Sequence, residues 1–262
     1  MRATRPQFLT AALMVLFAVW GGLGVLQTSM TLPPPVPRAV AMRPHRRPPV
    51  WPPAVQGAAT AARPDCATTP CIALTFDDGP HPVVTPQILA TLERHNVRAT
   101  FFVIGVHVPG NEGLLQRMYA DGDEIGNHTW GHADLTTLSA DQVEEQVLNT
   151  QAVITAAGVP APRLLRPPYG AVNTMVRSHV PLTIAMWNAD PEDWKKTRAS
   201  QVVASVETAA GPGKVIDMHD TKQPTADALD QILTDLAPSY QFVTVSELLN
   251  LAPGQPGVFF GR

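Results

Sequence analysis

Seven short apolar runs, rich in β-branched residues, alternate with amphipathic stretches between Cys66 and the C-terminus of this chain. Each run has the length of a strand, and the segments between them carry apolar residues at helical spacing. Repeated strand–helix units predict a parallel sheet covered by helices. We therefore expect an α/β fold, an irregular (β/α) barrel of seven parallel strands with outer helices. The expected strands are Ile72–Phe76, Ala99–Ile104, Glu124–Asn127, Leu164–Arg166, Leu182–Trp187, Lys214–Met218 and Phe242–Val245.

Capping residues mark the ends of several expected helices. Thr85 followed by Pro86 predicts an N-cap and first helical residue, with the helix running to about His95. Ser139 predicts the N-cap of a longer helix that ends at Gly158.

The first 65 residues have a different character. Arg2 and Arg5 precede an apolar run from Phe8 to about Leu26, whose length lies between that of a signal-peptide core and that of a membrane-spanning helix. We expect residues 1–30 to be a signal peptide or a membrane anchor, and we favour the uncleaved anchor. Residues 31–65 contain ten prolines and are expected to form an extended basic linker. Residues 66–262 then remain for one well-cored domain.

Charge is divided unevenly between the tail and the domain. Residues 1–64 hold 7 arginines and no acid, whereas the remainder holds 12 basic and 22 acidic residues and carries a net charge of −10. An acidic body excludes a nucleic-acid-binding domain, because phosphate contacts need clustered Lys and Arg. Two cysteines are too few for a disulfide-rich scaffold. Cys66 and Cys71 are expected to close a short disulfide if the domain is exported, the alternative being two small apolar thiols.

Polar residues gather directly after five of the expected strands. In a parallel barrel the carboxyl ends of the strands meet at one rim, where catalytic residues are found. Folding alone does not explain five such clusters at one rim. They are Asp77-Asp78, His128 with His132, Arg166 to Gly170, Asp190 with Asp193 and Trp194, and His219-Asp220.

In order and residue type these clusters resemble the polysaccharide deacetylase family, also called the NodB-homology domain or family 4 carbohydrate esterases. The resemblance covers about residues 66–250 and leaves out the N-terminal tail. The segments that carry it are Thr75-Phe76-Asp77-Asp78-Gly79-Pro80, His128-Thr129-Trp130-Gly131-His132, Arg166-Pro167-Pro168-Tyr169-Gly170, Asp190-Pro191-Glu192-Asp193-Trp194 and Ile216-Asp217-Met218-His219-Asp220.

The resemblance implies a divalent metal site. Asp78, His128 and His132 supply one carboxylate and two imidazoles, a ligand set that suits a divalent cation with open positions. The implied cofactor is Zn²⁺ or another divalent ion.

The same resemblance implies the roles of the acid–base residues. Asp77 is the expected general base, and Arg166 is expected to hold its carboxylate in place. His219 is the expected general acid, paired with Asp193, which favours the charged imidazole.

Three further residues are expected at the substrate. The two prolines before Tyr169 lack N–H groups, so the Tyr169 N–H is the first free donor after Arg166. The resemblance implies that this N–H is the oxyanion donor, whereas the segment alone is also compatible with a rigid loop in which Tyr169 packs. Trp194 and Ile216 are expected to line the acetyl pocket, although the family usually has Leu where Ile216 stands. The other histidines are expected to be solvated or structural: His81, His95, His107 and His179.

Together these features predict metal-dependent hydrolysis of N-acetyl groups on an extracellular amino-sugar polymer. Peptidoglycan is the first expected substrate and chitin oligomers the second. One alternative is removal of O-acetyl groups from xylan at the same site, and another is a carbohydrate-binding domain without catalysis. The protein is expected outside the cytoplasm, either membrane-anchored through its apolar segment or secreted, with a polysaccharide and no protein as its partner.

Overall fold

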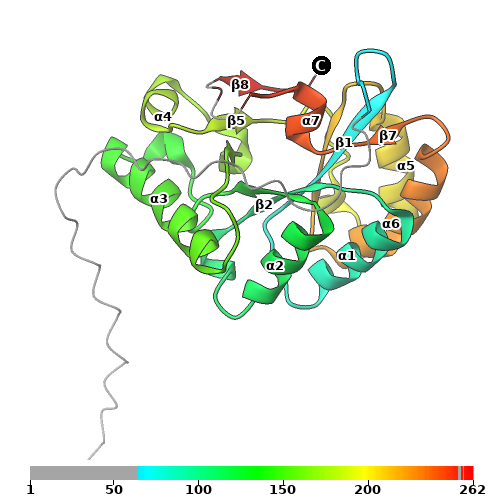
Figure 1. The fold of residues 1–262 in the computed structure, drawn as a ribbon, viewed down its shortest axis with the longest axis horizontal. Helices are drawn as coiled ribbons and strands as arrows, with labels where there is room; N and C mark the ends of the chain where they lie inside the picture. Colours follow the sequence, from blue (N-terminus) through cyan, green and yellow to red (C-terminus); the bar gives the residue numbers. More distant parts are fainter. Residues whose placement is uncertain (1–63, 253–254, 256, 262) are drawn as a thin grey trace, which may run out of the picture. The chain divides into compact units, whose positions relative to one another are not determined.

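A computed structural model describes residues 64–252, 255 and 257–261. Its strands pair in parallel throughout, in the order β6-β1-β2-β3-β4-β5-β8, and β7 pairs with β1 beside this path (Figure 1). The predicted irregular parallel barrel is therefore confirmed. The strands are β1 Cys71–Asp77, β2 Thr100–Val103, β3 Glu124–Asn127, β4 Leu164–Leu165, β5 Thr183–Ala185, β6 Val215–His219, β7 Gln241–Phe242 and β8 Val258–Phe259.

The two ends of the sheet differ from the expectation. β8 was not predicted, and it extends the sheet by pairing with β5. The predicted strand Phe242–Val245 is wrong at its end, because Val245 already begins a helix. At the opposite end of the strand order, Ala189 forms an isolated bridge with Ile216 of β6, which brings the segment after β5 to that edge.

Helices follow the strands, as in Figure 1, and α1 and α5 both pack against α6. Ser139 caps its helix as predicted, in a reciprocal pair with Gln142. The prediction that Thr85 is an N-cap is wrong, because the helix begins one residue earlier and the His81 imidazole accepts from the N–H groups of Val83 and Val84. The helices are α1 Val84–His95, α2 Glu112–Asp121, α3 Ala140–Ala156, α4 Thr174–His179, α5 Ala199–Ala209, α6 Gln223–Leu236 and α7 Val245–Leu249.

The two central strands carry opposite chemistry on their two faces. In β1, Leu74 and Phe76 pack into the apolar core beneath the helices, and in β6 Ile216 and Met218 do the same. Because side chains alternate along a strand, the residues between them point into the barrel. The inward-facing residues of β1 and β6 can therefore form a site: Thr75, Asp77, Asp217 and His219.

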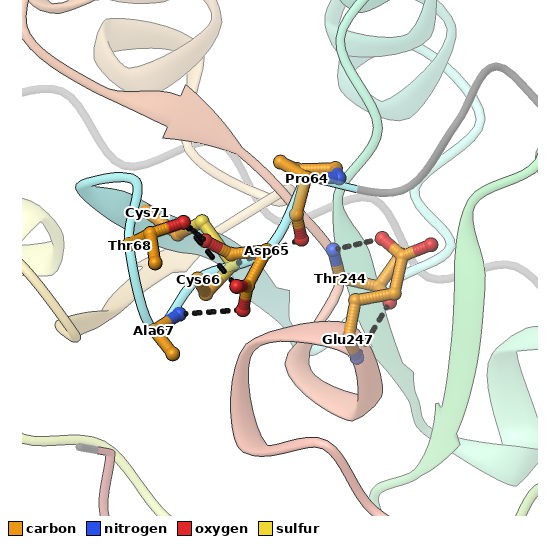
Figure 2. The surroundings of a disulfide bond; sticks show 8 residues. All are labelled: Pro64, Asp65, Cys66, Ala67, Thr68, Cys71, Thr244 and Glu247. Carbon is orange, nitrogen blue, oxygen red and sulfur yellow. Dashed lines mark hydrogen bonds between the residues drawn. A yellow bond between two sulfur atoms is a disulfide. The ribbon is translucent and has the colours of Figure 1, made fainter.

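A disulfide joins Cys66 to Cys71 at the start of β1, as predicted, with an S–S distance of 2.07 Å. Figure 2 shows it near Thr244 and Glu247, whose reciprocal hydrogen bonds cap α7. The Cys71 side chain packs in an apolar cluster with Val245 of that helix. The disulfide thus secures the chain where it enters the domain.

The expected anchor or signal peptide, residues 1–30, lies outside the described residues, as does nearly all of the linker, 31–65. Within the described part of the chain, none of the helices has the length and apolar character required to cross a bilayer.

Candidate metal and catalytic site

Asp78, His128 and His132 converge at the carboxyl ends of β1 and β3. Potential ligand atoms of the three side chains lie within 4.8 Å of one another. Asp78 Oδ1 is 3.5 Å from His128 Nε2 and 3.2 Å from His132 Nε2. Residues distant in the sequence therefore present one carboxylate and two imidazole nitrogens to a common point.

Second contacts fix which ring nitrogen faces that point. His128 Nδ1 lies 2.7 Å from the carbonyl oxygen of Arg166 and therefore donates to it, which leaves Nε2 as a lone-pair ligand. His132 Nδ1 lies 3.1 Å from the Tyr169 hydroxyl. Burial and the charge of His128 lower the pKa of His132, and this favours the neutral imidazole that a metal requires.

The backbone around this point is strained at several residues, Thr129 (φ 69°) among them. Asp78, His132 and Tyr169 have φ of 76°, 57° and 60°, in the left-handed region that non-glycine residues rarely occupy. Such outliers gather at functional sites, where the surrounding structure enforces them. The turn after Asp78 is also crowded, because a Cβ on Gly79 would lie 2.0 Å from Asp220 Oδ2.

These residues fit a divalent cation. Asp78 Oδ1 is buried and has no hydrogen-bond partner among the described residues, and an orphaned buried carboxylate oxygen is costly without a cation. Although burial opposes it, the closeness of the His128 imidazole lowers the pKa of Asp78 to about 2, so the carboxylate is ionised. One oxygen and two nitrogen ligands are a donor set of Zn²⁺ and related divalent ions.

Asp77 and Arg166 form a buried pair directly beside the cation site. Arg166 is fully buried, and its Nη1 donates to Asp77 Oδ1 at 2.8 Å. The other oxygen, Asp77 Oδ2, lies 3.6 Å from His128 Nε2. One face of the Asp77 carboxylate is therefore held by the guanidinium while the other faces the metal ligands.

Asp217, which the sequence analysis did not single out, shares the same guanidinium. Its Oδ1 also accepts from Arg166 Nη1 at 2.8 Å. The same Nη1 donates to Thr75 Oγ1 at 2.7 Å. Burial, and then the charge of Asp77, raise the pKa of Asp217 well above its usual range, although Arg166 opposes this. Asp217 therefore holds a proton more strongly than an ordinary carboxyl does, and the guanidinium is left to pair with Asp77.

His219, which is partly buried, and Asp193, which is fully buried, form a second pair at the end of β6. His219 Nδ1 lies 2.7 Å from Asp193 Oδ1, and Asp193 Oδ2 accepts from the His219 N–H and from Thr225 Oγ1. Burial alone would lower the pKa of His219, but the hydrogen bond and charge of Asp193 outweigh it and raise the pKa to about 9. His219 is therefore poised as a cation with Nε2–H directed away from Asp193.

The three expected substrate residues are placed differently. Tyr169 is 70% exposed and Trp194 is 51% exposed, so both offer aromatic surface to solvent. The Tyr169 N–H has no acceptor among the described residues, whereas the next two N–H groups bond to Pro167 and Pro168. Ile216 is not brought to this group, because it is fully buried in the core on the opposite face of β6 from His219.

Comparisons with known proteins agree with this geometry. A family model described as polysaccharide deacetylase matches residues 65–181. The peptidoglycan-N-acetylglucosamine deacetylase PgdA of Listeria monocytogenes is 45% identical over 71% of this chain, but the match spans only 40% of that longer protein.

Solved structures are similar to most of this chain. A structure described as a T48 deacetylase with substrate is 38% identical with a TM-score of 0.69, covering 73% of this chain and 98% of that one. A family 4 acetyl xylan esterase from Clostridium thermocellum, in complex with a cobalt ion, is 36% identical with a TM-score of 0.67, covering 71% and 94%. The chain belongs to the polysaccharide deacetylase family.

Proposed function

We propose that this protein removes N-acetyl groups from an extracellular amino-sugar polymer by metal-dependent hydrolysis. The observation that carries the proposal is the convergence, at one rim, of three metal-ligand side chains with a guanidinium-held carboxylate and a carboxylate-held imidazole. Hydrolysis of an amide requires one group that accepts a proton and another that donates one, and these two pairs can supply them.

Asp78, His128 and His132 would hold the cation. When bound, a divalent cation supplies Lewis-acid polarisation of the acetyl carbonyl and of the attacking water. Asp77 accepts the proton of that water through Oδ2, because Arg166 occupies Oδ1. The water oxygen then forms the new bond to the acetyl carbon.

The remaining residues complete the reaction on the other side of the acetyl group. The Tyr169 N–H donates to the carbonyl oxygen as negative charge develops there. His219 Nε2–H gives its proton to the sugar nitrogen while the C–N bond breaks. The products are acetate and a free amino sugar, and Asp77 and His219 return to their starting forms by exchanging protons with solvent.

Peptidoglycan is the first proposed substrate, and chitin-type oligomers the second. The similar Listeria protein is named for deacetylating N-acetylglucosamine in peptidoglycan. The tail fits this location: residues 1–30 would serve as a membrane anchor or signal peptide and residues 31–65 as a linker, placing the domain 66–262 outside the cytoplasm near the cell wall.

Removal of O-acetyl groups from xylan is the second candidate. It is favoured by the likeness to an acetyl xylan esterase across nearly the whole of that structure. An ester needs less help from a general acid than an amide does, since its leaving group is better. The same residues would therefore suffice.

Acetate release tests the proposal. Purified protein with Zn²⁺ should free acetate from an N-acetylglucosamine oligomer or from peptidoglycan, and EDTA should abolish the release. His128→Ala should lower both metal content and turnover, whereas His179→Ala, in the last turn of α4, is the matched control. Tight oligomer binding with no acetate from any substrate would instead establish a binding domain, and release only from acetylated xylan would favour the esterase.

A further inference from the structure

A second hollow adjoins the cation site. The inner hollow, about 330 Å³, is lined by Asp78 and His132, and the outer one, also about 330 Å³, extends toward Pro82. Both are lined by Val106, His107 and Thr221, so the two hollows share one wall. Each volume is at the lower end of the range for small-ligand sites, about 300–1,000 Å³.

The hydrogen bonds of two histidines fix the polarity of the outer hollow. His81 Nδ1 accepts from two backbone N–H groups, at 3.2 and 3.1 Å, so the neutral ring carries its hydrogen on Nε2 and is a donor. His107 Nδ1 lies 2.8 Å from the carbonyl oxygen of Asp78 and must donate to it, so in the neutral ring Nε2 is an acceptor. One donor and one acceptor therefore line the same hollow.

The rest of the lining is uncharged. Asn111 donates through Nδ2 to the His107 carbonyl, and its Oδ1 has no donor among the described residues. Three prolines add apolar surface: Pro80, Pro82 and Pro109. No Lys, Arg, Asp or Glu is among the residues that line the outer hollow, so it offers an anionic group no charge partner. A neutral group with several hydroxyls and an apolar face matches this surface.

We propose that the outer hollow binds the uncharged sugar that adjoins the acetylated unit in the polymer, with His107 Nε2 accepting from one of its hydroxyls. This inference rests on the proposed function and adds a specificity-determining residue to it. It revises the sequence expectation for His107, which was that of a solvated or structural histidine. His107 is exposed, and it lies between the cation site and the outer hollow.

Two substitutions distinguish the roles of the two ring nitrogens of His107. His107→Asn places an amide N–H near the position of Nδ1, so it keeps the donor to the Asp78 carbonyl but loses the acceptor. His107→Gln places an amide oxygen near the position of Nε2, so it keeps the acceptor but loses the donor. His179→Asn is the matched control, because His179 Nδ1 also lies 2.9 Å from a main-chain carbonyl, that of Met175, away from both hollows.

The experiment measures kcat/KM for the N-acetylglucosamine dimer and tetramer, together with zinc content. In wild-type protein the tetramer should be the better substrate. His107→Asn should reduce that advantage by about fivefold through KM, the worth of one neutral hydrogen bond, with full zinc content. His107→Gln should keep most of the advantage and lose zinc more readily, and His179→Asn should match wild type.

An unchanged length dependence in His107→Asn would overturn the proposal, as would equal losses in the Asn and Gln variants accompanied by lost zinc, which would reduce His107 to a support for Asp78. Calorimetric titration of both oligomers keeps the test independent of turnover. If wild-type protein frees no acetate, the proposed function fails, while a tetramer affinity that drops only in His107→Asn would still support sugar binding in the outer hollow.

Discussion

The two acid–base pairs of the site are charged in opposite ways. On one side, Asp77 faces a fully buried guanidinium that it shares with a second carboxyl, Asp217. On the other, His219 faces a fully buried carboxylate, Asp193, that it shares only with neutral donors. The first pair thus has one cation for two acids, and the second has one anion for one imidazole.

This difference sets the direction of proton transfer. Where two carboxyls compete for one guanidinium, one of them takes a proton and the other stays ionised and able to accept. Where an imidazole has a carboxylate to itself, the cationic form is stabilised and able to donate. A base and an acid are therefore held in place before substrate arrives.

Removing the Arg166 guanidinium, which Asp77 and Asp217 share, should have the largest effect on the stability of the fold. Arg166→Met would leave Asp77 and Asp217 buried together without a counter-charge, and breaking a buried pair in this way costs about 3–5 kcal/mol. Urea denaturation should show this loss in the free energy of unfolding. Arg177→Met, an exposed arginine on α4, is the control and should cost little.

A second variant sharpens that prediction. Adding Asp217→Asn to Arg166→Met removes one of the stranded carboxyls and should restore part of the lost stability. A double variant no more stable than Arg166→Met would show that the two acids do not compete, against the account given above.

Neutralising the base should cost most of the activity while leaving the metal in place. Asp77→Asn keeps the shape of the side chain but removes the proton acceptor, and general-base catalysis contributes about 10²–10⁴-fold. Acetate release should fall by this factor at unchanged zinc content, and Asp141→Asn, an exposed acid on α3, should behave as wild type. Turnover that survives in Asp77→Asn would remove it as the base.

Deleting the acid should separate two classes of substrate. His219→Ala should slow amide cleavage by about 10²-fold or more, since an amine leaves poorly without a proton. Cleavage of an acetyl ester should slow less, because an alcohol is the better leaving group. Equal losses on a matched amide and ester would count against His219 as the proton donor.

The alternation of inward and outward residues along the strands explains how much of the fold and of the site could be predicted from the sequence. Periodicity located the strands, because β-branched runs such as Ile72–Phe76 need burial on both faces. The resemblance located Asp77, Arg166 and His219, because their motifs are local in sequence. Asp217 was passed over, although strand alternation places it on the same face as His219, and the same alternation argues against Ile216 at an acetyl pocket.

Other features depend on contacts that no local pattern encodes. β8 has two residues, and it becomes a strand only because the edge of β5 is free to pair with it. Thr85 has the type of an N-cap, but its hydroxyl donates to Asp220, a residue 135 positions away, and the cap falls to His81. The outer hollow arises where the segments after β1, β2 and β6 meet.

Weakening the pair of His219 and Asp193 without removing His219 should have the smallest effect on turnover and the clearest effect on its pH dependence. Asp193→Asn removes the charge that raises the pKa of His219, which should fall from about 9 toward or below the ordinary 6.5. At pH 7 about a quarter or less of the imidazole would then be protonated, so amide turnover should drop several-fold, and the alkaline limb of the rate profile should move to lower pH. The quantity to measure is the difference in the pKa of His219 between wild type and Asp193→Asn, because a bound divalent cation lowers the pKa in both proteins.

The same pair should appear in the pH dependence of stability. Because the pKa of His219 is raised in the folded protein, the pair stabilises the fold fully below about pH 6.5, and this contribution is lost as the pH rises through about 9. The wild-type free energy of unfolding should therefore decline over that window, and the decline should be smaller in Asp193→Asn. Parallel curves for the two proteins would mean that Asp193 does not set the protonation of His219, and the contrast between the two pairs would then rest on geometry alone.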